Sequence, residues 1–208
     1  MVDKYQPDQN NIKHLDKEAS RLGMGGNSSP EVDENLYKKR MQKRKEIQLE
    51  RVKERNLEKG LVIVFTGNGK GKTTAALGMG LRTLGHGYKV AIIQFIKGAW
   101  TTGEKKAFEK FSNNIEWKSL GAGFTWETQN RNKDQFLVNK AWELAKEFIK
   151  NESYKLVILD EINIAIKLGY INTEEIIIFL KDLNMNKNLC HVILTGRGAS
   201  KEIIEFAD

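Results

Sequence analysis

The sequence predicts an α/β fold: a mostly parallel β-sheet with helices on both faces, preceded by a long basic N-terminal helix. Two observations predict the sheet. Short apolar runs follow one another along the chain, and stretches of helical periodicity alternate with them. Strands that are apolar throughout are typical of parallel sheets covered by helices on both faces. As a third observation, the first apolar run leads directly into the glycine-rich segment "FTGNGKGKTT" at residues 65–74.

Composition allows one domain of ordinary size with an appendage. The chain has 208 residues, of which 40% are hydrophobic and 9% aromatic, enough for a packed core. No apolar run approaches the length of a membrane span, and the N-terminus has no apolar signal segment. The single cysteine, Cys190, excludes an intrachain disulfide framework and a cysteine-based zinc cluster. We therefore expect a cytoplasmic protein without a membrane partner.

The N-terminal region is predicted to have two parts. Residues 1–28 are polar and are expected to form a disordered leader, whereas residues 29–59 form a basic helix or arm. Ser29 suits the N-cap of this helix and Pro30 its first position. Between residues 35 and 60, ten basic and four acidic side chains give a net charge of +6 out of the total of +7. The rest of the chain is nearly neutral, so no nucleic-acid-binding face is predicted on it. A solvated surface helix is an equally plain interpretation of the arm.

The third predicted part, residues 60–208, begins where apolar strands and helices start to alternate. The run "LVIVF" is the first strand and "KTTAALGMGLRTLG", closed by Gly85, is the first helix. A later stretch from residue 134 has apolar residues at a clear helical period. The predicted strands cover residues 61–65, 89–95, 114–120, 155–161 and 189–196, and the predicted helices cover residues 72–85 and 134–150. In such sheets ligands bind beyond the carboxyl ends of the strands.

The glycine-rich segment predicts a phosphate-binding loop and therefore a P-loop NTPase-like fold. The usual pattern G-x-x-x-x-G-K-[ST] fits Gly71, Lys72 and Thr73, but its first glycine is replaced by Thr66. Backbone N–H groups of such a loop converge on phosphate oxygens, its lysine neutralises charge, and its hydroxyl faces Mg²⁺. A strand before the loop and a helix after it disfavour a chance glycine-rich turn. The residues predicted to hold the nucleotide are Gly67, Asn68, Gly69, Lys70, Gly71, Lys72, Thr73 and Thr74.

Other candidate residues lie at the ends of later strands. Asp160 and Glu161 end the strand "LVILDE", where a carboxylate is the usual metal partner of a P-loop threonine; a helix N-cap would explain Asp160 nearly as well. Arg197, in "LTGRG", could reach a triphosphate or pair with a surface acid. Phe124 and Trp126, in "GAGFTWETQNR", could form a satellite core or the wall of a pocket for a flat ligand.

No Ser-His-Asp set and no nucleophilic cysteine site is recognisable in the sequence. A P-loop enzyme without an evident base can still carry out chemistry if the nucleophile arrives on a cofactor. The segments "FTGNGKGKTTAA", "GHG", "QFIKG.W..GE", "GFTWETQN", "VILDE" and "ILTGRG" resemble, in order and spacing, the P-loop-type ATP:corrinoid adenosyltransferases. The resemblance covers roughly residues 36–208, and "GFTWETQN" is its most discriminating part.

The resemblance implies transfer of the 5′-deoxyadenosyl group of ATP to the cobalt of a reduced corrinoid, cob(I)alamin or cobyrinate a,c-diamide, with release of triphosphate, in cobalamin biosynthesis or salvage. It implies that the shortened loop holds ATP in reverse sense, and that Lys72, Phe124 and Trp126 serve catalysis, the two aromatics lining the corrinoid pocket. It implies Mg²⁺ (or Mn²⁺) at Thr73 and the acids Asp160 and Glu161, Glu161 above all.

The resemblance also implies partners and a rival function. The basic helix would cover the active site across a homodimer, and a flavoprotein reductase would supply electrons. Family members usually continue with a further strand and tail where this sequence stops at "KEIIEFAD", so either the protein is short or the sequence is a fragment. The alternative functions are a P-loop ATPase that acts on nucleic acid or a protein through the basic arm, and an inactive nucleotide-binding module.

Overall fold

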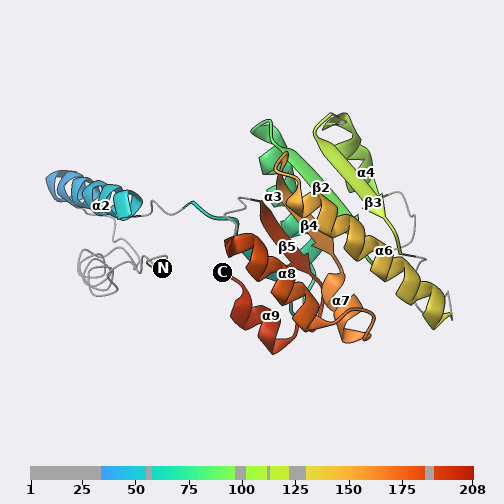
Figure 1. Ribbon diagram of the computed structural model, residues 1–208. Helices are drawn as coiled ribbons and strands as arrows, with labels where there is room; N and C mark the ends of the chain where they lie inside the picture. The colour runs from blue at the N-terminus through green and yellow to red at the C-terminus, as the bar shows by residue number, and fades with distance from the viewer. Residues whose placement is uncertain (1–33, 55–57, 97–101, 112, 122–129, 186–189) are drawn as a thin grey trace. The chain divides into compact units, whose positions relative to one another are not determined.

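The structure is a computed structural model that describes residues 34–54, 58–96, 102–111, 113–121, 130–185 and 190–208 (Figure 1). The chain divides into two compact units, residues 1–58 and 59–208, and each is described by itself. The predicted leader, residues 1–28, lies outside the described residues, as does the predicted helix start at Ser29.

The described part of the first unit is the helix α2 (Glu34–Glu54). An acidic residue in its first turn and basic residues in its last turn suit the helix dipole. Ile47 is only 3% exposed, whereas other apolar side chains such as Leu49 and Val52 are exposed, in agreement with the sparse apolar pattern. Residues 58–60 are not helical, so the prediction that the helix reaches residue 59 is wrong at this end.

The second unit is built on a five-stranded parallel sheet in the order β1-β5-β4-β2-β3. All five predicted strands and the parallel arrangement are confirmed; four strands are shorter than predicted by one to three residues, and β4 has the predicted length but begins and ends one residue earlier. The register aligns Phe65 with Thr195 and Gln94 with both Asp160 and Ser119, so the carboxyl ends of the strands lie level. The strands are β1 (Val62–Phe65), β2 (Lys89–Gln94), β3 (Ile115–Ser119), β4 (Tyr154–Asp160) and β5 (His191–Thr195).

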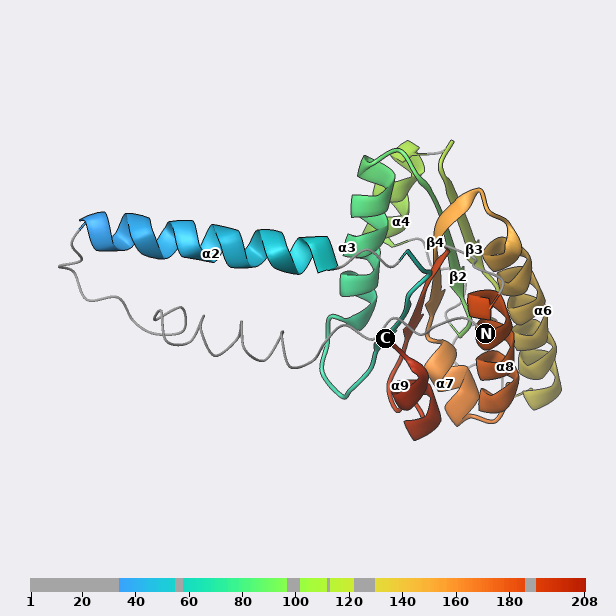
Figure 2. The ribbon, with the colours of Figure 1, turned by 60° about the vertical axis from the view of Figure 1, so that its left-hand side comes forward.

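Helices cover both faces of the sheet, as predicted (Figure 2). On one face, α3 and α4 enclose a core with inward residues such as Ile92 and Ile158. On the other, α6, α8 and α9 enclose a core with Ile93 and Leu159, the next residues along the same strands. This alternation follows from the two-residue period of a strand. The helices of this unit are α3 (Lys72–Gly85), α4 (Gly103–Phe108), α6 (Arg131–Lys150), α7 (Ile162–Lys167), α8 (Thr173–Met185) and α9 (Lys201–Phe206), with the 3₁₀ turn η1 (Glu109–Phe111).

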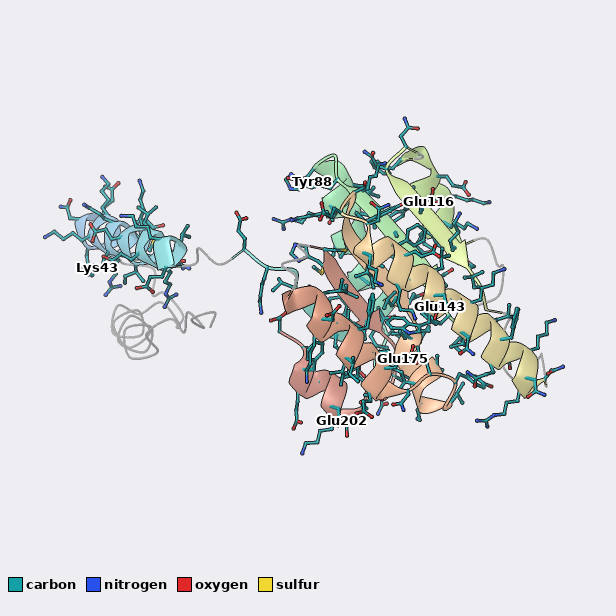
Figure 3. All side chains as sticks on the ribbon, in the orientation of Figure 1. Lys43, Tyr88, Glu116, Glu143, Glu175 and Glu202 are labelled. Atoms are coloured by element: carbon teal, nitrogen blue, oxygen red, sulfur yellow. The ribbon has the colours of Figure 1, made fainter. Side chains whose placement is uncertain are left out.

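A hydrogen bond and an ion pair link α6 with α8. The indole N–H of Trp142 on α6 donates to the carboxylate of Glu175 on α8 at 2.6 Å, and the ammonium group of Lys146 on α6 lies 3.9 Å from the same carboxylate. Glu175 is labelled in Figure 3. None of the described helices has the length and apolar character that a membrane crossing requires.

The predicted bounds of α3, residues 72–85, are confirmed: Gly85 is the last helical residue and His86 is the C-cap residue. Gly87, with φ of 80°, makes the turn into β2. The residue that adopts the left-handed conformation is therefore the second residue after the helix.

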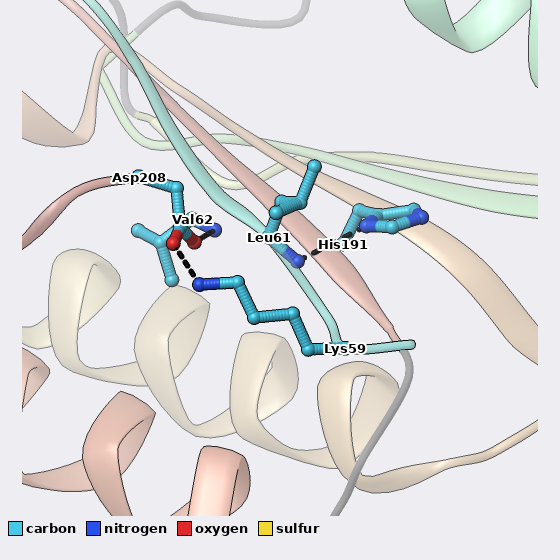
Figure 4. Close-up of polar contacts among 5 residues, drawn as sticks. All are labelled: Lys59, Leu61, Val62, His191 and Asp208. Carbon is cyan, nitrogen blue, oxygen red and sulfur yellow. Dashed lines mark hydrogen bonds and ion pairs between the residues drawn. The ribbon is translucent and has the colours of Figure 1, made fainter. Parts of the chain in front are cut away.

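At the amino ends of the strands, hydrogen bonds and an ion pair hold the start of β1 in place (Figure 4). The backbone N–H of Leu61 donates to Nδ1 of His191 at 3.0 Å. The N–H of Val62 donates to the Asp208 carboxylate at 2.9 Å, and the Asp208 N–H donates to the Val62 carbonyl at 2.9 Å. Lys59 forms an ion pair with the same carboxylate. These contacts lie at the amino ends of the strands, whereas the candidate site lies at their carboxyl ends.

Candidate active site

The glycine loop connects β1 with α3 and is exposed from Thr66 to Gly71. Gly67 and Gly71 have φ of 103° and 101°, in the region where residues with a side chain are strained. A Cβ atom built on either glycine would meet nothing within 4 Å, so the backbone conformation and not the available space requires glycine. The loop therefore stays open to a ligand from outside.

The Lys72 side chain turns back across this loop. Its ammonium group donates to the carbonyl of Gly67 at 2.9 Å and to that of Gly69. The cation is thus held within the loop, where a phosphate group would take over its hydrogen bonds. Asn68 and Lys70 are exposed in the same loop, and Thr74 is exposed on the first turn of α3.

Thr66, which replaces the usual first glycine, has a contact of its own. Its Oγ1 accepts a hydrogen bond from the backbone N–H of Ala199 at 3.1 Å. The Gly196 N–H also donates to the Phe65 carbonyl, at 3.2 Å. The glycine loop is thereby fastened to the loop after β5, which carries the exposed Arg197.

Asp160, at the carboxyl end of β4, is only 1% exposed. Its Oδ1 accepts hydrogen bonds from the hydroxyl groups of Thr73 and Thr195, both at 2.8 Å. Its Oδ2 accepts from Nε2 of Gln94 at 3.0 Å. The structure thus brings the predicted pair Thr73 and Asp160 together, and both oxygens of this carboxylate already have donors.

The Gln94 carboxamide extends this network to β3. Its Oε1 accepts from the indole N–H of Trp117 at 3.1 Å and from the hydroxyl of Ser119 at 2.8 Å. Gln94 itself is 5% exposed. Sequence reasoning missed Gln94, Ser119 and Thr195, although each is a polar residue at the carboxyl end of a predicted strand, which is a signal that could have identified them.

Glu161 has an unusual backbone. Its φ of 64° and ψ of 21° are left-handed, and it is the one non-glycine residue with positive φ among the residues that the structure describes. Such strain in a side-chain-bearing residue is concentrated at functional sites. Its N–H donates to the Thr195 hydroxyl oxygen at 2.9 Å. Glu161, not Asp160, occupies the N-cap position of α7, and its side chain makes no capping hydrogen bond.

The residues at hand fit a hydrated Mg²⁺ ion bound together with phosphate. Among the described residues, no three His, Cys, Asp or Glu side chains form a metal-binding group. Mg²⁺ does not need such a group, because it keeps several waters and takes one or two carboxylates and phosphate oxygens. Thr73 and Glu161 could supply protein oxygens, while Asp160 holds the Thr73 hydroxyl. Phe124 and Trp126 lie outside the described residues.

Comparison with known proteins identifies relatives along most of the chain. The family model for ATP:corrinoid adenosyltransferase BtuR/CobO/CobP matches residues 58–208. A corrinoid adenosyltransferase of Sinorhizobium sp. is 45% identical over 186 residues, which are 89% of this chain and 86% of that protein. A corrinoid adenosyltransferase of Pseudomonas aeruginosa is 42% identical over 182 residues, 88% of each chain. Corrinoid adenosyltransferase CobA of Salmonella typhimurium is 40% identical over 177 residues, 85% of this chain and 88% of that protein.

The matched residues contain the glycine loop, Thr73, the two acids after β4 and the loop after β5. The family model therefore spans every described part of the site, and relatives at this level of identity cover most of both chains. The chain belongs to the ATP:corrinoid adenosyltransferase family.

Proposed function

We propose that the protein transfers the 5′-deoxyadenosyl group of ATP to the cobalt of a reduced corrinoid and releases inorganic triphosphate. The observation that carries the proposal is the hydroxyl of Thr73, held at 2.8 Å by the buried Asp160 beside a glycine loop that carries Lys72. This arrangement suits a triphosphate with its cation. Family membership supplies the second substrate, the corrinoid.

The chemistry needs no protein base. Reduced cobalt is itself the nucleophile and attacks C5′ of the ribose, so a cobalt–carbon bond forms while the bond from C5′ to the triphosphate oxygen breaks. The electron pair of that bond leaves on the triphosphate. The protein's contribution is to position the two substrates and to stabilise the negative charge of the leaving group. The loop N–H groups and Lys72 perform the second task.

The cation of this reaction, Mg²⁺ or Mn²⁺, would be held by Thr73 and Glu161. Both oxygens of Asp160 accept hydrogen bonds, which favours Asp160 as the residue that orients the Thr73 hydroxyl and Glu161 as the direct carboxylate ligand. When bound, the ion neutralises part of the triphosphate charge. Arg197, exposed in the loop that is fastened to Thr66, could reach the same phosphates.

The remaining parts of the proposal concern partners. Phe124 and Trp126 are proposed to line the corrinoid pocket, and the basic helix α2 to cover the active site of a second copy in a homodimer. A flavoprotein reductase is the proposed electron donor, and the cytoplasm the proposed compartment.

The test incubates the protein with ATP, Mg²⁺ and chemically reduced cobalamin. We expect a light-sensitive adenosylcobalamin spectrum and one triphosphate for each adenosyl group transferred. Omission of the corrinoid should leave ATP intact. Formation of ADP and phosphate without an adenosylated product would refute the proposal and indicate an ATPase.

A further inference from the structure

Asn163, on the first turn of α7, is a buried polar residue that the proposed reaction does not yet use. It is 0% exposed. Within the part of the chain that the structure describes, neither Nδ2 nor Oδ1 of its amide has a hydrogen-bond partner. A buried amide without partners lowers the stability of a fold, so its presence requires an explanation, such as a partner gained when a ligand binds.

The surroundings of Asn163 point to that partner. A Cβ atom built on Gly196 would lie 3.0 Å from Cβ of Asn163 and 3.2 Å from Oε2 of Glu161. Cβ of Asn163 and the Glu161 carboxylate therefore lie beside the same narrow space, which exists because residue 196 has no side chain. Gly196 also has φ of 129°, so both its conformation and its neighbours require glycine.

The position of the Glu161 carboxylate depends on a backbone that is fixed by two features. The left-handed conformation (φ 64°) and the hydrogen bond from its N–H to Thr195 hold the main chain. Thr195 in turn donates to Asp160. Rotation about the side-chain bonds of Glu161 thus determines where its carboxylate lies relative to Thr73.

We infer that Asn163 is a positioning residue whose Nδ2–H donates to the Glu161 carboxylate and holds it in the orientation that binds the cation accompanying ATP. The inference rests on the proposed function, because the cation at Glu161 is part of it. A hydrogen bond from an amide to a carboxylate is strengthened by the charge. Partners of this kind, one step removed from the ion, change metal affinity about 10- to 100-fold.

The test measures how much Mn²⁺ is needed for ATP binding. Trace labelled ATP is mixed with excess protein, Mn²⁺ is titrated, and a parallel series with EDTA gives the metal-free ATP affinity. For Asn163→Leu, which replaces the amide by an apolar group with the same number and branching of non-hydrogen atoms, we expect the half-saturating Mn²⁺ concentration to rise about tenfold or more. The metal-free ATP affinity should stay within twofold, and the melting temperature should be equal or higher because an unpaired buried amide is gone.

Two further variants serve as controls. Asn163→Ala also removes the amide, without any new bulk, and should raise the Mn²⁺ requirement similarly. Ile162→Leu repacks the adjacent buried position at constant volume and should leave the requirement unchanged.

The outcomes separate this inference from the proposed function. If the wild-type protein binds ATP with no dependence on Mn²⁺, the cation site of the proposed function fails, and the inference with it. If the wild type depends on Mn²⁺ and both Asn163 variants depend on it equally, the inference alone is overturned, and an internal water is the better partner for the amide. A fall in both the metal-free ATP affinity and the melting temperature of the Asn163→Leu variant would also overturn the inference, because the amide would then support the fold.

Discussion

Replacement of Gln94 by leucine tests whether its carboxamide organises the strand ends. The change removes three hydrogen bonds: one to the buried Asp160 at 3.0 Å and two accepted from Trp117 and Ser119 at 3.1 and 2.8 Å. The bond to the carboxylate should contribute about 1.5–3 kcal/mol, and each of the others about 0.5–1 kcal/mol, because Trp117 and Ser119 are partly exposed and can bind water. The expected loss of unfolding free energy is therefore about 2.5–5 kcal/mol.

For a unit of this size, the loss corresponds to a fall in melting temperature of about 5–20 °C. The assay is urea unfolding with a parallel melting curve. Ser119→Ala, which removes only the hydrogen bond from Ser119 to Gln94, should lower the unfolding free energy by about 1 kcal/mol or less. In the double variant the serine change should cost nothing further, because its acceptor is already gone. A Gln94→Leu protein within about 0.5 kcal/mol of the wild type would refute the reasoning.

Three further predictions use single residues elsewhere in the fold. Lys72→Ala should lower the adenosylation rate by about 10²–10³, with little change in melting temperature because the loop is exposed; a rate within a few-fold of wild type would contradict the role given to Lys72. His191 has a pKa lowered from its usual value by burial, and its Nδ1 must stay unprotonated to accept from Leu61. Its contribution to stability should be complete above about pH 6.5 and should fall as the pH drops below that value, a dependence that urea unfolding would detect and that His191→Gln should remove. Burial raises the pKa of the Cys190 thiol to about 12, so a thiol reagent at pH 8 should react only after unfolding; rapid reaction of the folded protein would show that the thiol is accessible.

Much of the fold could be predicted because its strands are continuous apolar runs. The same signal did not mark α7 and α9, which have six residues each and thus fewer than two helical turns. The helix α8 was missed because the apolar residues 176–180 follow one another without the gaps of a helical period. A helix is recognised in a sequence by such gaps between its apolar residues. The surface against which these segments pack is set by the folded sheet and is not visible in their own sequence.

The candidate site likewise has some residues that could be predicted from the sequence and others that could not. Thr73 and Asp160 could be predicted, since the motif of a phosphate loop and an acid after an apolar strand are local features. Gln94 reaches Asp160 only because β2 lies beside β4, and Thr195 reaches it because β5 lies on the other side. The order of the strands in the sheet cannot be read from the sequence. The left-handed backbone of Glu161 likewise results from contacts made across strands and not from its own propensity.

The strand order also has a consequence for how the protein is made. Among the described strands, β1 pairs only with β5, the last to be synthesised, and the contact of Thr73 with Asp160 joins residues 87 positions apart. A chain that emerges from the ribosome amino end first therefore cannot place its phosphate loop until residues 191–195 have been added. Until then the apolar strand "VIVF" is without its sheet neighbour, and we expect affinity for nucleotide to appear only after β5 has paired with β1.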